Sequence, residues 1–319
     1  KLKLKKNIFL NFSSIPGLAK KARDNSNSYF NKELNKLIKL SAAKGFIGVE
    51  FPYFRFLKNS KSIENLKTFL KKNNQKYIID CEKKISKKEV IKLISISKKL
   101  NLKFIRVKCS DILCCERKDY KNKWSDKIKS IIEKINQMKP ILKKNHIKLA
   151  IENHQDLDSN DILKIIKYVG KSYVGVNFDV GNAFATCELP LEFFKKVKKY
   201  IINIHLKDYI ILPTKKGYAL YKCPIMEGDG QVSKILQLIK LNKIKCPISL
   251  ELGAKTQREI KINSKFFFKS FLKEKKKKLK NSETIVKLAN KNMHKIDEIK
   301  KLISLNEINM LNKSIKNLN

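Results

Sequence analysis

Long hydrophobic runs, paired cysteines and glycine-rich phosphate loops are all missing from this sequence of 319 residues. Without about 18 consecutive apolar residues, no segment is predicted to span a membrane. The seven cysteines include no CxxC pair and no spacing typical of a disulfide framework, which favours reduced thiols in a cytoplasmic protein. No GxGxxG or Walker-type loop follows the first strand-like run, which argues against a nucleotide-binding sheet. The apolar run near the start is broken by Asn11 and Pro16 and has no cleavage signal, so we predict a strand there rather than a leader.

Arginine and acidic residues are scarce beside lysine. Lys and Arg together number 72 against 29 Asp and Glu, which gives a net charge of +43, yet only five of the 72 are Arg. Proteins that read phosphates and bases depend on Arg for bidentate contacts. The Lys residues spread along every predicted helix therefore indicate a compositional drift over solvated faces. We expect no specific nucleic-acid partner and no membrane partner, although the charge would attract anionic substrates.

Short apolar runs alternate with Lys-rich amphipathic segments, a pattern typical of βα units around a parallel sheet. Strands are predicted at residues 7–12, 46–51, 77–80, 104–108, 148–152, 174–179, 201–206 and 248–252. Helices are predicted between them at residues 31–43, 63–72, 89–100, 127–144, 161–169, 191–199 and 233–241. Eight strands with intervening helices predict an α/β fold, a closed (β/α)8 TIM barrel, rather than an open sheet.

The composition changes after the eighth predicted strand. Residues 261–272 are predicted to form the final barrel helix, with their phenylalanines packed inwards. Residues 273–281 form a charge run that we expect to be solvated. Apolar residues then recur at helical spacing from Ile285 to Ile303, so a last amphipathic helix either docks on the barrel or joins two subunits. We accordingly divide the chain into a barrel, residues 1–272, and a Lys-rich C-terminal helical extension, residues 273–319.

Four successive predicted strands end in a side chain that can bind a metal ion. These are Glu152, Asp179, His205 and Glu251, each following a hydrophobic run. In a TIM barrel the C-terminal ends of the strands face one shared mouth. A buried carboxylate or imidazole is costly unless it is paired or bound to a metal, so four of them predict one divalent cation. Three carboxylates and one imidazole suit Mn²⁺, Co²⁺ or Mg²⁺, with Zn²⁺ as an alternative.

The sequence around these residues resembles the xylose isomerase-like TIM barrel superfamily, and within it the sugar phosphate isomerase/epimerase branch. The resemblance is most specific over residues 148–253, in the runs IENHQDLDSNDILKIIKYVGKSYVGVNFDVGNA, YIINIHLKDY, EGDGQV and ISLELG, and GFIGVEF fits the second strand. It implies that Glu152, Asp179, His205 and Glu251 bind one divalent metal. It also implies that Glu152 and Glu251 act as the acid/base pair that moves a proton on the carbon next to a carbonyl.

The function implied is that of a divalent-metal-dependent isomerase or epimerase acting on a sugar, a sugar phosphate or an inosose. The metal would polarise the substrate oxygens and stabilise the enediolate formed on proton removal. Glu152 and Glu251, approaching from opposite sides, would deprotonate one face and reprotonate the other, which gives epimerisation. A single glutamate moving the proton between neighbouring carbons would give isomerisation instead.

Four further residues are candidate substrate contacts. His154 projects to the same side as Glu152 by strand alternation and would either hydrogen-bond a sugar hydroxyl or serve a structural role. Asn182 stands where many relatives carry a His in a DxGH motif, which puts that contact in doubt but not the family. Lys207 is a candidate for neutralising substrate oxygens. Glu50 would either reach a substrate hydroxyl or form a salt bridge within the barrel.

The stretch of residues 210–228 is predicted to be a lid in which Tyr218 and Tyr221 shield the pocket from water. Loops at the mouth set specificity in such barrels, and here they match no known motif, so the sequence predicts a small carbohydrate substrate without naming it. A homodimer is the expected oligomer, if one forms.

Three alternatives remain open. A dehydratase of the inosose or dehydroshikimate type would use the same metal and proton abstraction and then expel a β-hydroxyl. An AP endonuclease-like DNA-repair enzyme needs three metals and several more histidines, whereas this chain has four His in all, with Asn182 in place of one and Gly230-Gln231 where a DxH pair would stand. The third alternative is a sugar-binding barrel without catalysis, which metal content after purification would distinguish.

Overall fold

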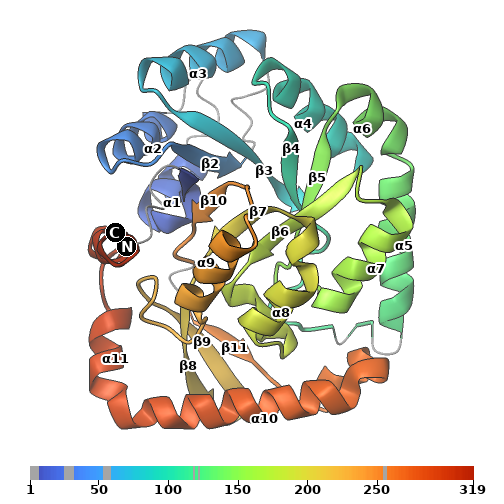
Figure 1. Cartoon of the computed structure of the whole chain (residues 1–319), viewed down its shortest axis with the longest axis vertical. Helices are drawn as coiled ribbons and strands as arrows, with labels where there is room; N and C mark the ends of the chain where they lie inside the picture. The colour runs from blue at the N-terminus through green and yellow to red at the C-terminus, as the bar shows by residue number, and fades with distance from the viewer. Residues whose placement is uncertain (1–6, 25–31, 53–58, 118, 121–122, 254–256) are drawn as a thin grey trace.

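Eight parallel strands close into a barrel, which confirms the predicted TIM barrel (Figure 1). The computed structural model describes residues 7–24, 32–52, 59–117, 119–120, 123–253 and 257–319. The barrel strands are β1 (Ile8–Asn11), β2 (Gly48–Pro52), β3 (Lys76–Lys84), β4 (Phe104–Lys108), β5 (Lys148–Glu152), β6 (Val174–Asp179), β7 (Ile201–Leu206) and β10 (Ile248–Leu250). Each of the eight expected strands is present, and β10 closes the barrel by pairing with both β7 and β1.

Amphipathic helices surround the barrel. They are α1 (Pro16–Asp24), α2 (Lys32–Ala43), α3 (Ser60–Lys72), α4 (Lys87–Lys99), α5 (Trp124–Asn136), α6 (Lys139–Asn145), α7 (Ser159–Val169), α8 (Pro190–Val197) and α9 (Val232–Leu241). In α7 the buried apolar residues recur at helical spacing, and Asp158 and Asp161 form a capping box at its start. The single helix expected over residues 127–144 is two helices, α5 and α6, and Asn31, the expected start of α2, lies outside the described residues.

The predicted lid is an antiparallel hairpin. Strands β8 (Tyr209–Thr214) and β9 (Gly217–Lys222) pair with each other, and β11 (Arg258–Ile260) adds a third strand beside β9. Tyr218 is fully buried, and its hydroxyl donates to the Phe184 carbonyl at 2.6 Å. Tyr221 packs in a small apolar cluster on the hairpin. Neither tyrosine lines the pocket at the barrel mouth, so the shielding role expected for them is wrong.

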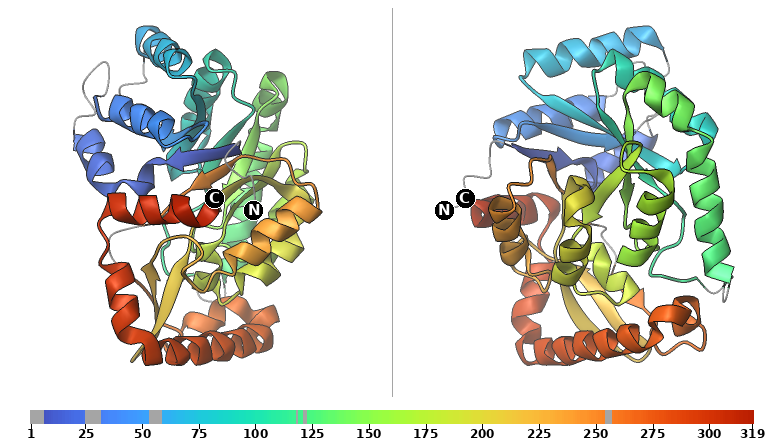
Figure 2. Two further views of the ribbon diagram at one scale, coloured as in Figure 1. Left: turned by 60° about the vertical axis from the view of Figure 1, so that its left-hand side comes forward. Right: turned by 45° about the vertical axis from the view of Figure 1, so that its right-hand side comes forward.

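The segment after β10 does not form the barrel helix expected at residues 261–272. It makes turns and then the 3-10 helix η7 (Phe267–Glu274), and Phe267 and Phe271 pack with the hairpin instead of the barrel core. The long helix α10 (Lys275–Asn292) then runs along the hairpin and buries Ile285 and Ala289 in the same cluster (Figure 2). The hairpin offers these phenylalanines a second apolar surface besides the barrel, and the sequence pattern alone does not reveal that surface.

The helix expected between Ile285 and Ile303 is two helices, α10 and α11 (Ile296–Ile303), whose buried apolar residues pack on the hairpin, and a further helix that was not expected docks on the barrel. After α11, helix α12 (Glu307–Leu318) places Met310, Leu311 and Leu318 in the main barrel core. It lies beside α1, where the Gly17 amide donates to Glu307 at 2.8 Å (Figures 1 and 2). Helix α12 therefore covers the barrel in the position that residues 261–272 were expected to fill.

The charge run at residues 273–281 is not wholly solvated as expected. Lys278 is buried, with its side chain 1% exposed, and its ammonium group donates to the Thr186 carbonyl at 2.9 Å. The same group lies 3.2 Å from Asp158 Oδ2 and 3.3 Å from Glu188 Oε2. One lysine of the run therefore fastens α10 to the barrel.

Among the helices that the structure describes, none is both long enough and apolar enough to cross a bilayer. All seven cysteines are free thiols.

Candidate metal centre at the barrel mouth

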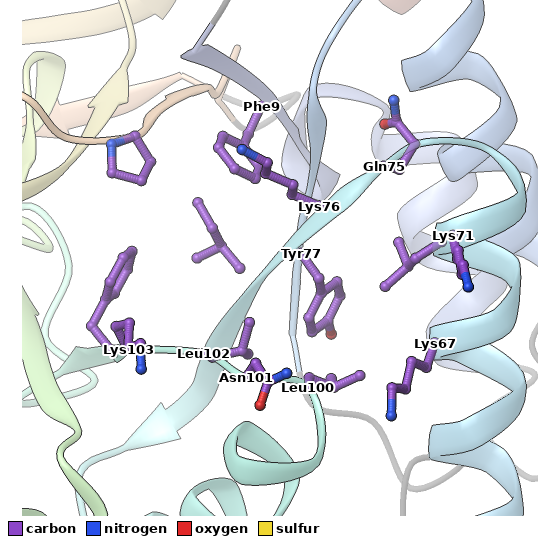
Figure 3. Close-up of a pocket in the computed structure, with 14 residues that line it drawn as sticks. Phe9, Lys67, Lys71, Gln75, Lys76, Tyr77, Leu100, Asn101, Leu102 and Lys103 are labelled. Carbon is purple, nitrogen blue, oxygen red and sulfur yellow. The ribbon is translucent and has the colours of Figure 1, made fainter.

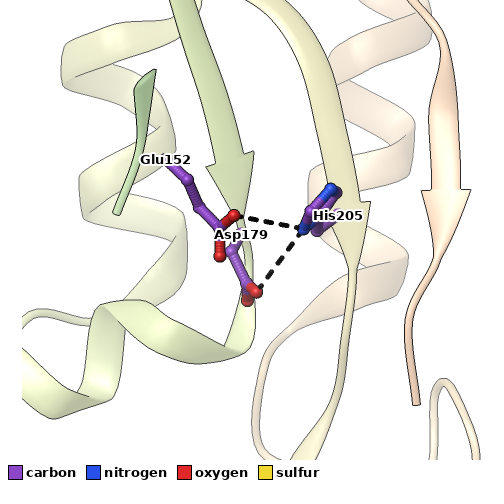
Figure 4. A group of neighbouring side chains, drawn as sticks. All are labelled: Glu152, Asp179 and His205. Carbon is purple, nitrogen blue, oxygen red and sulfur yellow. Dashed lines mark ion pairs between the residues drawn. The ribbon is translucent and has the colours of Figure 1, made fainter. Parts of the chain in front are cut away.

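Glu152, Asp179 and His205 converge from the ends of β5, β6 and β7 (Figure 4). All three are fully buried, and one ligand atom from each lies within 4.8 Å of the others. His205 Nδ1 is 3.7 Å from Glu152 Oε2 and 3.9 Å from Asp179 Oδ2. The sheet register places Asp179 directly beside His205, so the parallel strands bring these side chains together as the sequence predicted.

Glu251, just beyond β10, approaches the same imidazole from the next strand. Its Oε2 lies 2.7 Å from His205 Nδ1, and its Oε1 lies 2.8 Å from the Lys207 ammonium. Lys207 is also 2.7 Å from Asp179 Oδ2, so its charge bridges two of the predicted ligands. Burial alone would raise the pKa of Glu251, but Lys207 and His205 hold it well below its usual range.

The environment of His205 fits a divalent cation. Its Nδ1 is buried and faces the carboxylates of Glu152, Asp179 and Glu251, and Glu251 Oε2 lies 2.7 Å away as its ion-pair partner. Its other nitrogen, Nε2, is 2.8 Å from Glu50 Oε1. A histidine that binds a metal commonly has its second nitrogen fixed by a carboxylate in this way. A divalent cation held by these three carboxylates would take Nδ1 as a further ligand, and oxygen and imidazole donors are suitable ligands for one.

Glu50 is placed beneath this centre and not in the pocket above it. It is fully buried on β2, accepts a hydrogen bond from the Ser249 hydroxyl and faces His205. Burial alone would raise the pKa of Glu50. The contacts with His205 and Ser249 have the larger combined effect, so the pKa of Glu50 is lowered. Of the two roles left open for Glu50, the structure shows the ion pair within the barrel, and the expected contact with a substrate hydroxyl is not supported.

A buried polar layer supports the candidate ligands, and the sequence analysis missed it. Asn177 and Asn203 hydrogen-bond to each other at 2.5 Å, and Asn203 also donates to Glu50 at 3.4 Å. Each of Asn177, Asn203 and Ser249 stands two residues before Asp179, His205 or Glu251 on the same strand. Because side chains two apart on a strand share a face, polar residues at this spacing were a readable signal for an inward-facing polar layer.

Arg106, in the middle of β4, was also missed. Its guanidinium group is buried and forms ion pairs with Glu152 and Asp80. Burial raises the pKa of Glu152 to about 7, against the lowering effects of Arg106 and His205. A lone Arg inside the apolar run FIRVK was the signal, because a buried guanidinium group requires carboxylate partners.

A pocket of about 410 Å³ opens above these residues. His154, Asn182 and Lys207 line it, as expected of substrate contacts, and so does Glu251. The Asn182 side chain lies 3.4 Å from Glu152 Oε1, and its backbone amide donates to Asp179 at 3.0 Å. Three of the four candidate substrate residues therefore face one cavity together with a proposed catalytic carboxylate.

A second cavity, of about 450 Å³, lies at the opposite end of the barrel (Figure 3). It is lined by residues at the starts of the strands, among them Phe9, Lys76 and Phe104, and by the ends of α3 and α4. Among the described residues, its lining contains no carboxylate, imidazole or thiol. The N-terminal end of a TIM barrel usually serves stability, so the mouth pocket is the better candidate for chemistry.

Asp208, the residue after Lys207, organises the EGDG loop, residues 227–230, next to the pocket. Its Oδ1 accepts hydrogen bonds from the amides of Tyr209 and Gly230, and its Oδ2 accepts from Met226 and Gly228 at 3.0 and 3.1 Å. A Cβ atom at position 228 would lie 2.4 Å from Asp208 Oδ1, so glycine is needed there for the close approach.

We expect Asp208→Asn to lower the free energy of unfolding by about 2–4 kcal/mol, because its amide nitrogen would face two partly buried N–H donors and leave them without an acceptor. Urea denaturation measures this loss. Asp111→Asn, a half-exposed carboxylate at the rim, is the matched control and should change stability by less than about 1 kcal/mol. Equal losses in the two variants would contradict the proposed loop anchor.

Residues 38–269 match the sequence model of the family described as xylose isomerase-like TIM barrel. A crystal structure of such a protein from Mycobacterium smegmatis, in complex with magnesium, is similar over 89% of this chain and 97% of its own, with a TM-score of 0.63 and 16% identity. A D-tagatose 3-epimerase-like protein is similar over 88% and 98% of the two chains, with a TM-score of 0.55 and 18% identity. Other similar structures include sugar epimerases and a probable dehydratase.

The chain also matches curated relatives over only part of their length. One is the 3-oxo-isoapionate decarboxylase of Pectobacterium atrosepticum, 23% identical over 106 residues, which are 33% of this chain and 38% of that protein. The matched segments span little more than a third of each of the two curated relatives, 36% and 38%. The family match covers most of the chain and includes all four strand-end residues. The chain belongs to the xylose isomerase-like TIM barrel family.

Proposed function

We propose that this protein is a divalent-metal-dependent isomerase or epimerase that moves a proton on a carbon next to the carbonyl of a sugar or cyclitol. The observation that carries the proposal is the position of Glu152 and Glu251, which approach His205 Nδ1 from different strands of the barrel mouth. Two carboxylates on either side of one small cavity can serve a single carbon from two directions. The epimerases among similar structures are consistent with this chemistry.

Glu152, Asp179, His205 and Glu251 would hold the cation. A divalent ion bound there would polarise the substrate carbonyl and stabilise the negative charge that develops on its oxygen. Glu152 would take or return the proton on one side, with Arg106 fixing its Oε2 and Asn182 beside its Oε1. Glu251 would act on the other side, held in place by Lys207.

The buried surroundings of these carboxylates exclude bulk water from the proton that they handle. Glu152 is fully buried and the side chain of Glu251 is 13% exposed, so bulk water does not compete for the proton during its transfer, while the open pocket lets the carboxylates equilibrate with solvent between turnovers. Such shielding suits return of a proton to carbon. A dehydratase would share the first step and differ by expelling a β-hydroxyl, so analysis of the product distinguishes the two reactions.

The direct test is proton exchange. The purified full-length chain, loaded with Mn²⁺, Co²⁺ or Mg²⁺, is incubated in D₂O with a panel of ketoses, inososes and their phosphates. We expect one substrate class to incorporate deuterium at the carbon next to the carbonyl, with an epimer or isomer appearing by NMR. Loss of water from the product would favour the dehydratase, and no exchange with any member of the panel would argue against the proposal.

Glu50→Gln is expected to weaken divalent-metal affinity about 10- to 100-fold, because Glu50 fixes His205 through Nε2 and raises its basicity. Isothermal titration with Mn²⁺ measures the change, and the unaltered chain should bind one ion. Glu64→Gln, an exposed carboxylate on α3, is the matched control and should leave the affinity unchanged. If both variants bind the ion as the unaltered chain does, Glu50 has no part in the metal centre.

A further inference from the structure

Arg258 brings a guanidinium group into the mouth pocket from the three-stranded sheet outside the barrel. It lies on β11, which pairs with β9, and it lines the same cavity as Lys207 and Glu251. Because a buried nitrogen of this residue has no hydrogen-bond partner among the described residues, we infer that the substrate carries an anionic group, a carboxylate or a phosphate, which Arg258 binds at the pocket rim. This inference rests on the proposed function and adds the substrate class to it.

The guanidinium group has an unused donor. Arg258 Nε is buried and has no hydrogen-bond partner among the described residues, and within the same set of residues its side chain forms no ion pair. The other cationic groups of the pocket are already engaged, because Lys108 lies 3.1 Å from Asp111 and Lys207 lies 2.7 Å from Asp179. A buried donor on a charged group is costly to leave without an acceptor, so a ligand that supplies one gains affinity.

A second unsatisfied polar atom belongs to a residue that lines the same cavity. His154 Nδ1 is buried and lacks a hydrogen-bond partner within the part of the chain that the structure describes, and His154 lines the pocket beside Lys207. A ligand with several acceptor oxygens would satisfy Arg258 Nε and, in the tautomer that carries its proton on Nδ1, His154 as well. The two orphaned atoms therefore point to a ligand with several acceptor oxygens.

The chemistry of the guanidinium group specifies the kind of oxygen. Its donors form a planar fork that matches the paired oxygens of a carboxylate or a phosphate, and such charge-assisted contacts are about twice as strong as neutral hydrogen bonds. Glu251, by contrast, connects the pocket to the buried carboxylates of the candidate metal centre, which suit a cation. A substrate with a neutral reacting end and an anionic far end fits both halves of the cavity.

Equilibrium binding tests the inference without turnover. Isothermal titration of the Mg²⁺-loaded full chain compares D-fructose, D-fructose 6-phosphate and D-gluconate as neutral, phosphate and carboxylate probes. We expect at least one of the two anions to bind more tightly than D-fructose. The anion that binds more tightly then shows whether Arg258 binds a phosphate or a carboxylate. Arg258→Gln should weaken binding of that anion about 10- to 100-fold and leave D-fructose unchanged.

Two further variants make the result specific. Lys216→Gln removes one positive charge from the exposed turn between β8 and β9 and should leave binding of the anion unchanged. Arg258→Lys keeps the charge without the fork and should recover part of the lost affinity. Arg258→Gln should bind Mg²⁺ as the unaltered chain does, which shows that the metal centre is intact.

The inference is overturned if neither anion binds more tightly than D-fructose, or if Lys216→Gln loses as much affinity as Arg258→Gln. The proposed function fails in a different way. Anion binding that depends on Arg258, without proton exchange on any substrate, would refute the isomerase proposal alone. Proton exchange on neutral sugars, without any preference for anions, would refute the anionic substrate alone.

Discussion

Glu152→Gln is expected to lower turnover by about 1,000-fold, within the range that general acid–base groups contribute. The substitution keeps the shape of the side chain and removes its capacity to accept a proton. Glu152 is fully buried, and Arg106 lies against its Oε2, so solvent has no direct route to replace the missing base. Measurement of kcat for the substrate found in the exchange assay, at saturating Mn²⁺, separates this loss from weaker metal binding.

Glu251→Gln should lower turnover by a similar factor. The two variants should differ in which proton transfer they lose. In an epimerase, each variant should retain slow deuterium exchange from one of the two epimers and lose it from the other. In an isomerase that uses a single glutamate, only one variant should lose exchange. The two patterns therefore distinguish the reactions that the geometry leaves open.

Glu192→Gln, an exposed carboxylate near the start of α8, is the matched control and should keep full turnover. Retention of turnover in both Glu152→Gln and Glu251→Gln would remove these residues from the acid/base roles assigned to them. Because Glu152 and Glu251 are also proposed metal ligands, titration with Mn²⁺ sets the concentration at which each variant is saturated, and kcat is compared there.

The sequence predicted the barrel and the convergence of its strand ends because both follow from local patterns. Strands buried on both faces read as apolar runs, and a polar side chain at the end of such a run stands out. Glu152, Asp179 and His205 were found by this contrast, and the parallel register then brings them together.

The partners of these side chains were harder to predict, since they come from distant strands. Glu50 reaches His205 across 155 positions of the sequence, and Arg106 reaches Glu152 across 46. A polar residue within a buried strand indicates that a hydrogen-bond or ion-pair partner exists, but the sequence does not identify that partner. This is why Glu50 was left between two roles and Arg106 received none.

The C-terminal region was misjudged for a related reason. Residues 261–272 and α12 both carry apolar residues that could cover the open position beside α1, and only α12 does so. Local pattern identifies an apolar face but not the surface that it will cover. The choice depends on the hairpin, which supplies a competing apolar surface for Phe267 and Phe271.

Lys278→Met is expected to lower the free energy of unfolding by about 3–5 kcal/mol, the usual cost of removing one partner from a buried ion pair. The Lys278 side chain is 1% exposed and lies between Asp158 and Glu188, which are themselves 7% and 2% exposed. Without the ammonium group, two buried carboxylates lose a counter-charge and the Thr186 carbonyl loses a donor. Urea denaturation of the full chain measures the effect.

Lys277→Met is the matched control, because this neighbour on α10 is exposed and the same substitution there should change stability by less than about 1 kcal/mol. The double variant Lys278→Met/Glu188→Gln should be more stable than Lys278→Met alone, since it removes one of the two buried charges that lost this counter-charge, and the side chain at position 188 no longer depends on Lys196, 3.3 Å away, as its remaining ion-pair partner. This recovery would assign the loss to electrostatics and not to packing of the lysine stem. If Lys278→Met and Lys277→Met unfold at the same urea concentration, α10 is held to the barrel by its contact with the hairpin and not by this lysine.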